Sequence, residues 1–254
     1  MHLSVIIPCY NEEENLKRGV LKQVKSYFKN KKFSWEVIIS DDGSTDASRE
    51  LVKKGIKEVS GFRLLENAHG GKPVALLNGI KKSNGEYVLI SDMDQSTPIG
   101  ELDKLLPYIE EDIAAVIGSR GLVRKNFPIY RKIGAIVFAS VRRALILPGI
   151  TDTQCGFKLF KSDILKKVFP KLEFFKSNVR TKGWIVTSFD VELLHLIKKF
   201  GGKIKEVPVV WHDKDFGGKN KGSGLGKYIK ESREMFGEIL RVKLNDLRGL
   251  YKKV

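Results

Sequence analysis

The sequence predicts an α/β fold: a mostly parallel sheet with helices on both faces, followed by a C-terminal amphipathic helix. Short runs of β-branched and other apolar residues alternate with longer segments in which apolar residues recur every three or four positions. Strands and helices that alternate in this way are typical of parallel sheets. The chain has 254 residues, of which 42% are hydrophobic, and this is sufficient for a sizeable core.

The predicted elements follow one another closely along the chain. The first strand spans residues 3–7 and is expected to end at Pro8. Asn11 is predicted to cap a helix with an acidic first turn and apolar residues four apart, at Leu16, Val20, Val24 and Phe28. Further strands are expected at residues 37–39, 62–65, 87–90, 113–117 and 207–211. Further helices are expected around residues 51–56, 74–80, 98–109, 127–150 and 225–250.

Polar clusters follow predicted strands at four places: PCYNE, SDDGSTD, NAHGGK and SDMDQ. Because ligands bind beyond the carboxyl ends of the strands in a parallel sheet, we expect these clusters to converge on one crevice. The first strand-to-helix turn contains no glycine, and the G-x-x-x-x-G-K-[ST] pattern is absent from the sequence. Neither a dinucleotide fingerprint nor a P-loop is therefore predicted.

The strongest candidate site is the carboxylate pair Asp92 and Asp94, which directly follows a predicted buried strand. Alternate side chains of an extended chain share a face, so both can point beyond the strand while Met93 turns toward the core. Two hard oxygen ligands at this spacing suit Mg²⁺ or Mn²⁺ shared with substrate phosphates. The alternative is that both only solvate a loop or favour a helix start, with Thr97 as N-cap and Pro98 at the first helical position.

A second pair, Asp41 and Asp42, can accept hydrogen bonds from a base or a ribose. The alternative is a role in a turn. We favour function, because a carboxylate pair that ends a buried strand carries a desolvation cost that a turn alone does not require. Gly70, Gly71 and Lys72 place a cation at a helix start, which suits a phosphate, although a solvated lysine in a flexible loop is an equal alternative.

The composition narrows the setting. Lysine and arginine number 46 against 30 acidic residues, which gives a formal net charge of +16. This charge favours binding of nucleic acid, nucleotides or an anionic membrane surface. The alternative is that the lysines only aid solubility. Two cysteines form no disulfide framework, so a reducing cytoplasm is the simplest setting. A secretory leader is not expected, because the N-terminal apolar run LSVIIP is short and lacks a charged region before it. A membrane span is not expected, because the most apolar stretch, residues 133–150, contains two arginines.

Seven motifs occur in one order over roughly residues 3–211: SVIIPCYNEEENL, VIISDDGSTDAS, HGGKPVALLNGI, VLISDMDQSTP, GSR, DTQCGFKLF and FDVELL. In this pattern the chain resembles the inverting family 2 glycosyltransferases of GT-A (Rossmann-like) fold. Within them it resembles the dolichyl-phosphate (polyprenyl-phosphate) glucosyltransferases and mannose synthases. The motifs DTQCGFKLF and FDVELL are most similar to the glucosyltransferase branch.

The resemblance implies a nucleotide-sugar donor, with UDP-glucose favoured and GDP-mannose as the other donor considered. Its uracil and ribose would bind near Pro8, Tyr10, Glu12, Asp42 and Lys72. Its diphosphate would bind Mg²⁺ or Mn²⁺ held by Asp92 and Asp94. In the mannose synthases a glutamine two residues after the second aspartate joins the metal site, and here Ser96 stands in that place.

On the acceptor side, the resemblance implies that Arg120 and Arg131 bind a lipid phosphate and that Asp152 and Gln154 line the same region. Asp94, Arg120 and Arg131 are the residues expected to act in catalysis. A lipid phosphate is ionised at neutral pH and needs no base, whereas a glycan hydroxyl would need one, for which Asp152 or Asp190 is the candidate. Surface solvation is the alternative for Arg131, and a structural role is the alternative for Asp152.

We expect a catalytic domain at residues 1–211, with a nucleotide-sugar-binding half at 1–118 and an acceptor half at 119–211. A basic, glycine-rich loop and an amphipathic helix follow at 212–254. The predicted function is inverting transfer of a sugar, with glucose favoured, to a polyprenyl or dolichyl phosphate. The alternatives are a family 2 transferase acting on a glycan hydroxyl and a non-catalytic protein that binds nucleotide sugars or polyanions.

The segment 127–150 and the last helix mix apolar and basic residues, which suits an anionic membrane surface, although packing on the domain is the alternative. We therefore expect peripheral association with the cytoplasmic face of a membrane. No nucleic-acid partner is expected, because no nucleic-acid-binding motif is evident.

Overall fold

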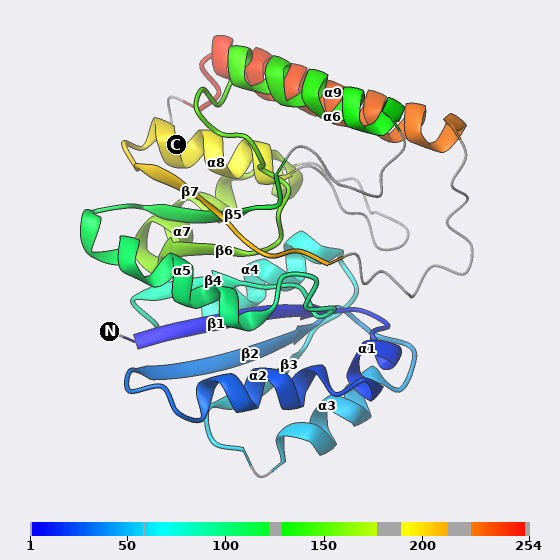
Figure 1. Cartoon of the computed structure of the whole chain (residues 1–254), viewed down its shortest axis with the longest axis vertical. Coiled ribbons are helices and arrows are strands. Elements are labelled where there is room, and N and C mark those ends of the chain that lie inside the picture. Colours follow the sequence, from blue (N-terminus) through cyan, green and yellow to red (C-terminus); the bar gives the residue numbers. More distant parts are fainter. Residues whose placement is uncertain (1, 58, 122–128, 177–188, 213–224, 252–254) are drawn as a thin grey trace.

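The computed structural model describes residues 2–57, 59–121, 129–176, 189–212 and 225–251 (Figure 1). In these residues one seven-stranded sheet has the order β3-β2-β1-β4-β6-β5-β7. The strands are β1 (His2–Cys9), β2 (Ser34–Asp41), β3 (Phe62–Glu66), β4 (Tyr87–Ile90), β5 (Ala115–Ser119), β6 (Lys158–Lys161) and β7 (Ile204–Pro208). All neighbouring strands are parallel except β6, which is antiparallel to both β4 and β5. The predicted mostly parallel sheet is confirmed.

The helices flank this sheet on both faces, as the sequence predicts. The α-helices are α1 (Glu13–Lys17), α2 (Val20–Phe28), α3 (Ser48–Ile56), α4 (Lys72–Lys82), α5 (Leu102–Leu105), α6 (Ile129–Leu145), α7 (Ser162–Val168), α8 (Phe189–Lys199) and α9 (Leu225–Leu247). Short 3₁₀ helices are η1 (Ile99–Glu101), η2 (Leu106–Glu111), η3 (Phe169–Lys171) and η4 (Glu173–Phe175). Helices α1, α2, α3 and α5 pack on one face, and α4, α7 and α8 pack on the other.

Strand β1 shows why the sheet needs both layers. Its side chains alternate between the two faces. Ile6 belongs to the core under α4, whereas Leu3, Val5 and Ile7 belong to the core under α2, and all are fully buried. A strand that is apolar on both sides is stable only when helices remove both faces from water.

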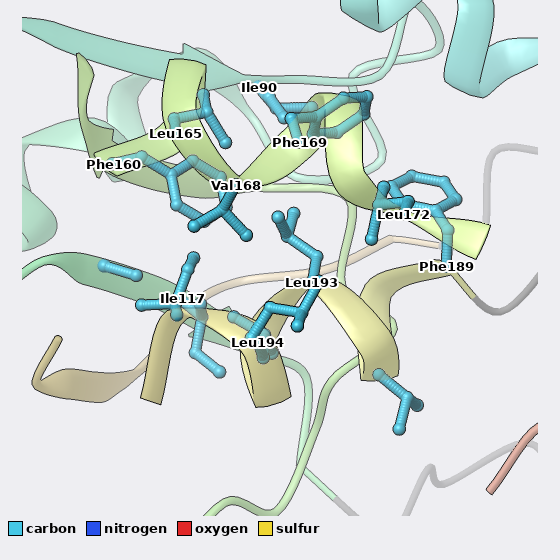
Figure 2. Packing of buried hydrophobic residues seen from close by; sticks show 14 of the residues in the cluster. Ile90, Ile117, Phe160, Leu165, Val168, Phe169, Leu172, Phe189, Leu193 and Leu194 are labelled. Carbon is cyan, nitrogen blue, oxygen red and sulfur yellow. The ribbon is translucent and has the colours of Figure 1, made fainter. Parts of the chain in front are cut away.

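The core between α7, α8 and the sheet positions the second half of the crevice (Figure 2). Leu193 and Leu194 of α8 lie against Ile117 of β5, and Phe169 packs on Phe189 with 5.9 Å between ring centroids. Burial of each such side chain stabilises the fold by about 1.5–3 kcal/mol. The first turn of α8 is therefore held firmly in the core.

Helices α6 and α9 lie side by side as an outer layer beyond α8 (Figure 1). Phe138 and Phe236 meet edge to face, with 5.6 Å between ring centroids. Glu192 of α8, only 1% exposed, accepts hydrogen bonds from Arg241 and Tyr251 and so ties α9 to α8. No helix among the described residues is long and apolar enough to cross a membrane.

Three expectations near the N-terminus are wrong. Strand β1 continues through Pro8 to Cys9, since a proline at this position still pairs in register with Ser40. The single helix expected up to Phe28 is two helices, because Gly19 adopts the left-handed φ of 82° between them. Asn11 does not cap α1. Its φ is 54°, and its side-chain oxygen accepts the backbone N–H of Thr45 at 2.8 Å, so it joins two loops instead.

Two further details differ from expectation. Thr97 makes no cap hydrogen bond, and Pro98 precedes a 3₁₀ turn, so the helix expected at 98–109 is a succession of η1, α5 and η2. The last strand is Ile204–Pro208 and not 207–211, because its register with β5 ends at Ser119 opposite Pro208. Strand β6 was not predicted at all.

Candidate active site

The carboxyl ends of β1, β2 and β4 lie at one edge of the sheet, and the polar clusters that follow them meet there. The backbone N–H of Asp42 donates to the carbonyl of Cys9 at 2.8 Å. The 69–72 loop lies between the two aspartate pairs, since Gly71 N–H donates to Asp42 and the Lys72 ammonium donates to Asp92. The convergence that the sequence predicts is therefore present in the structure.

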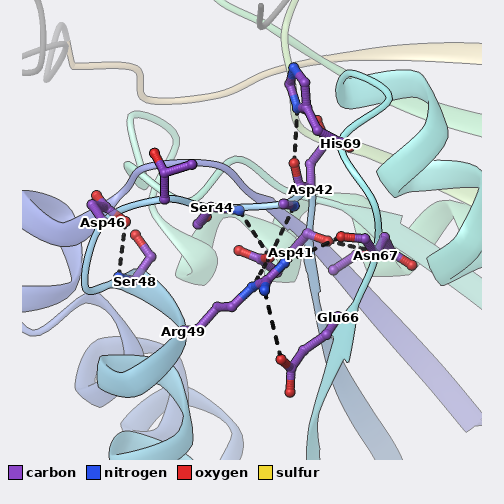
Figure 3. Close-up of polar contacts among 12 residues, drawn as sticks. Asp41, Asp42, Ser44, Asp46, Ser48, Arg49, Glu66, Asn67 and His69 are labelled. Atoms are coloured by element: carbon purple, nitrogen blue, oxygen red, sulfur yellow. Dashed lines mark hydrogen bonds and ion pairs between the residues drawn. The ribbon is translucent and has the colours of Figure 1, made fainter.

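Asp41 is fully buried and holds the turn after β2 (Figure 3). Its Oδ2 accepts the backbone N–H groups of Gly43 and Ser44 at 3.0 and 3.1 Å and Nε of Arg49 at 2.6 Å. Its Oδ1 is buried and has no hydrogen-bond partner among the described residues. The turn thus uses Asp41 as a structural acceptor, and a direct contact with a nucleotide stays a prediction.

Asp42 is also fully buried and holds the loop before α4. Its two carboxylate oxygens accept the backbone N–H groups of Gly70 at 3.0 Å and Gly71 at 2.9 Å. The ring of His69 lies 2.9 Å from the same carboxylate and stacks on Tyr10, with 4.5 Å between centroids and 21° between planes. Asp42 therefore places an aromatic pair beside the site, and its own contact with the donor stays a prediction.

Asp92 lies at this edge of the sheet with 36% of its side chain exposed. Its Oδ1 accepts a hydrogen bond from Lys72 Nζ at 2.5 Å. Burial acts to raise the pKa of Asp92, but Lys72, Lys158 and Arg120 hold it below its ordinary value. On the other side lies Gly156, where a Cβ atom would come within 1.9 Å of Asp92 Oδ2, so only glycine leaves room for this carboxylate.

Asp94 lies in the turn that follows β4, and Met93 between the two aspartates is buried as expected. Ser96 donates to Asp94 from its backbone N–H and its hydroxyl, both at 2.8 Å. Burial raises the pKa of Asp94 despite these bonds, and the charge of Asp92 adds to the rise.

Glu12 is the third carboxylate of this region. Burial raises the pKa of Glu12 to about 7, the hydrogen bond from Asn15 opposes the rise, and the charges of Asp94 and Asp92 add to it. The three carboxylates therefore add negative charge to the same region, although they do not form a three-ligand metal cluster among the described residues. Such a site favours a cation.

Arg120 and Asp152, which the sequence predicts to lie on the acceptor side, form a two-pronged ion pair. Nε and Nη2 of Arg120 donate to the two carboxylate oxygens at 2.7 and 2.8 Å, and its backbone N–H donates to Oδ2 at 3.0 Å. Burial acts to raise the pKa of Asp152, but Arg120 and the N–H of Gln154 lower it to about 2. The ring of Trp211 lies 5.7 Å from the guanidinium carbon. Arg120 is therefore fixed in orientation at the crevice.

Two residues that the sequence did not single out support this pair. Glu206 of β7 accepts the backbone N–H groups of Thr151 and Asp152 at 2.7 and 2.8 Å. Trp211 follows β7, and its neighbour His212 donates its N–H to the carbonyl of Ser96 at 2.8 Å. The segment after β7 thus connects Arg120 with the loop of the Asp92/Asp94 pair.

The structure also reveals a buried ion pair between Lys158 and Asp190. Lys158 is 2% exposed, and its ammonium donates to Asp190 at 2.6 Å and to the carbonyl of Cys155. The motifs DTQCGFKLF and FDVELL contain the two residues, and the fold brings β6 and the first turn of α8 together so that they pair. Arg131 belongs to α6, and its side chain lies outside the described part of the structure, as do residues 213–224 of the glycine-rich loop.

Residues 4–169 match the family model described as glycosyl transferase family 2. The chain belongs to this family. Among curated relatives, this family 2 transferase is 35% identical to the dolichyl-phosphate β-glucosyltransferase of Dictyostelium discoideum, across 99% of the chain and 77% of the relative. It is 32% identical to the enzyme of the same description from Saccharomyces cerevisiae, across 98% of the chain and 76% of the relative.

Solved structures share the fold of this family 2 transferase at lower identity. Glucosyl-3-phosphoglycerate synthase of Mycobacterium tuberculosis, in complex with Mn²⁺, UDP and its product, superposes with a TM-score of 0.64 at 16% identity, over 95% of this chain and 80% of that one. A mannosyltransferase of Pyrobaculum calidifontis with GDP-mannose and Mn²⁺ superposes with a TM-score of 0.62 at 19% identity, over 94% of this chain and 64% of that one. The GT-A fold is thereby confirmed.

Proposed function

We propose that this family 2 transferase moves glucose from UDP-glucose to a dolichyl or other polyprenyl phosphate, with inversion at the anomeric carbon. The two curated relatives described above carry this activity in their names and align with nearly the whole chain. The motifs that form the crevice are the motifs on which the resemblance rests. Both observations support the same donor and the same acceptor class.

The observation that carries the choice of acceptor is the state of the two carboxylates that a hydroxyl acceptor would need as a base. Asp152 is bound through both oxygens by Arg120, and its pKa of about 2 makes it a poor proton acceptor. Asp190 is bound by the buried ammonium of Lys158. A phosphate acceptor needs neither, because it is already an anion that can attack the anomeric carbon.

The donor set of the crevice fits a divalent cation. Asp92 and Asp94 supply hard carboxylate oxygens, and Ser96 is bonded to Asp94. Mg²⁺ and Mn²⁺ commonly use one or two carboxylates together with substrate phosphates. No cluster of three or more His, Cys, Asp or Glu ligands is present in the described residues. When bound here, the ion would neutralise the charge that develops on the departing diphosphate.

Residues of the chain would bind and orient the two substrates. Arg120, oriented by Asp152, would hold the acceptor phosphate, for which the guanidinium fork is well suited. Lys72 and the stacked ring of Tyr10 would position the donor. A phosphate oxygen then forms a bond to the anomeric carbon while the bond from that carbon to the UDP oxygen breaks, and no proton is transferred in this step.

A transfer assay tests this function. The protein is incubated with Mg²⁺ or Mn²⁺, UDP-glucose, UDP-galactose or GDP-mannose, and either a short polyprenyl phosphate or a free sugar as acceptor. Glucose appearing on the lipid phosphate is the expected result. Mannose from GDP-mannose on the same lipid would replace the donor, and product on the free sugar alone would overturn the lipid acceptor.

We further propose that the outer face of α6 and α9 contacts an anionic membrane on the cytoplasmic side. This face exposes large apolar side chains, with exposed fractions from 45% to 72%, at Ile136, Val137, Leu240, Leu244, Leu247 and Leu250. Arg248 is exposed among them. Apolar side chains that enter the interface while basic ones meet lipid phosphates are characteristic of helices that lie flat on membranes.

Flotation with vesicles tests this surface. The wild-type protein is expected to float with vesicles that contain phosphatidylserine and to remain below with neutral vesicles at high salt. The double variant Leu244→Ser, Leu247→Ser is expected to lose most binding while its melting temperature stays close to wild type, since both side chains are exposed. Unchanged flotation of the double variant would remove α9 from the contact surface.

A further inference from the structure

The Lys158–Asp190 pair lies between the donor and acceptor sides of the crevice. Strand β6 is antiparallel to its neighbours, so its first residue, Lys158, stands opposite Ile90 at the end of β4 and Ile117 near the end of β5. The chain reaches Asp92 two residues after Ile90 and Arg120 three residues after Ile117. Lys158 therefore occupies the position between the donor carboxylate and the acceptor arginine.

Asp190 extends this position into the crevice. It belongs to the first turn of α8, directly after Phe189, which is fixed in the core. Its Oδ1 accepts the ammonium of Lys158, and 17% of its side chain is exposed. Its other carboxylate oxygen, Oδ2, has no hydrogen-bond partner in the described part of the chain. This oxygen is also not one of the fully buried unpartnered atoms, so it is not completely enclosed.

The charge of Asp190 reaches both sides. Burial acts to lower the pKa of Lys72, but Asp92 and, more weakly, Asp190 hold it above its ordinary value. Burial likewise acts to lower the pKa of Arg120, but Asp152 and, more weakly, Asp190 raise it. A carboxylate that influences a donor-side lysine and an acceptor-side arginine lies close to the space that separates them.

The transferred sugar must occupy that same space, because its anomeric carbon is bonded first to the donor phosphate and then to the acceptor phosphate. We propose that Asp190 accepts a hydrogen bond from a hydroxyl of the transferred hexose and contributes to sugar specificity, with Lys158 as its positioning residue. This inference rests on the proposed function. In this role Asp190 is a fixed hydrogen-bond acceptor and not a base. A counter-ion such as the Lys158 ammonium is an advantage for a fixed hydrogen-bond acceptor.

A carboxylate is well suited to this role. It offers acceptor lone pairs only, so it binds a hydroxyl in one sense and rejects an epimer whose hydroxyl points elsewhere. Hydrogen bonds to charged groups are worth more than neutral ones, and a carboxylate oxygen that a wrong sugar removes from water without bonding to it opposes binding of that sugar. The ammonium of Lys158 donates to one oxygen of Asp190 at 2.6 Å and so limits the rotation of the carboxylate.

Binding of UDP and of UDP-glucose separates a sugar contact from a structural role, because UDP lacks the sugar. Calorimetry with Mn²⁺ is carried out on wild type, Asp190→Asn and Asp112→Asn. Asp112 is the matched control, because it pairs with Lys161 at 2.5 Å at the far end of the same strand and is exposed. Asp190→Asn is expected to weaken UDP-glucose binding about tenfold and UDP binding less than about twofold. Asp112→Asn is expected to change neither.

Steady-state transfer provides the second measurement. In Asp190→Asn, kcat/KM for UDP-glucose is expected to fall and the preference over UDP-galactose to narrow, while KM for the lipid phosphate stays unchanged. Lys158→Arg is expected to retain the preference, and Lys158→Gln is expected to lose it. Equal loss of UDP and UDP-glucose affinity, or an unchanged sugar preference, would overturn the role of Asp190 alone. Failure of the wild type to transfer glucose would overturn the proposed function, and this inference with it.

Discussion

Two aspartate pairs end buried strands at the same edge of the sheet, and they differ in what their oxygens bind. In the Asp41/Asp42 pair, both side chains are fully buried and accept N–H groups from their own turn or from the 69–71 loop. In the Asp92/Asp94 pair, Asp92 is 36% exposed and bonded to a lysine, and Asp94 is bonded only to Ser96. Similar sequence signals thus serve a structural purpose in one place and leave oxygens facing the crevice in the other.

The substitution Asp94→Asn tests the open pair and carries the largest expected effect. Loss of the negative charge is expected to reduce transfer by about 10²- to 10³-fold, the range found when one electrostatic contact to the reacting centre is removed. The melting temperature is expected to stay near wild type, since Asp94 bonds only within its own turn. Transfer kinetics at saturating metal and a thermal melt are the measurements. Undiminished turnover would remove Asp94 from the site.

The same change in the closed pair, Asp41→Asn, is expected to affect folding instead. The change weakens the bonds that the fully buried Asp41 carboxylate accepts from Arg49 and from the backbone N–H groups of Gly43 and Ser44, which costs about 2–3 kcal/mol of unfolding free energy. Urea denaturation measures this loss. Asp103→Asn is the control, because Asp103 pairs with Lys31 at the surface with 55% of its side chain exposed, where such pairs contribute less than about 1 kcal/mol. Equal losses in the two variants would contradict the distinction.

Asp152 extends the comparison to the acceptor side, where a closed carboxylate orients Arg120. Its folded-state pKa of about 2 lies below the ordinary value of 3.8, so its stabilisation is present above about pH 4 and is lost as the pH falls toward 2. The difference corresponds to about 2 kcal/mol. Urea denaturation is expected to show this difference in unfolding free energy between wild type and Asp152→Asn at pH 7, and a smaller difference at pH 3. If the difference in unfolding free energy does not change with pH, the Arg120–Asp152 ion pair is not its cause.

The sequence alone predicts more of the fold than of the candidate site. The alternation of helical and strand periodicity predicts the parallel sheet, and the position of polar clusters after strands predicts their convergence. Strand β6 is not predicted, because its sequence KLFK has only four residues with a lysine at each end and so contains no apolar run typical of a buried strand. Its antiparallel insertion between β4 and β5 depends on tertiary packing, which local pattern does not contain.

Lys158 and Glu206 were not predicted as site residues, and Asp190 was predicted only as a candidate base and not as the partner of Lys158. Lys158 and Asp190 lie 32 positions apart, and Glu206 lies 54 positions from Asp152, so neither contact leaves a local spacing to detect. The two aspartate pairs were visible, but their difference was not, because it lies in which backbone N–H groups reach each carboxylate. Burial and hydrogen-bond partners distinguish a structural carboxylate from one that faces a ligand.

The substitution Gly156→Ala tests whether the open pair also depends on its surroundings. The added methyl group would lie 1.9 Å from Asp92 Oδ2, so the carboxylate or the 155–158 turn must shift. A displaced carboxylate is expected to lower kcat/KM for the donor by about tenfold, since small misplacements at a reacting centre are costly. Gly100→Ala is the control, because a Cβ there meets nothing within 4 Å and its φ is not in the left-handed region. If both variants retain full transfer, the crevice tolerates movement of Asp92, and the distinction between the two pairs lies only in which ligands reach them.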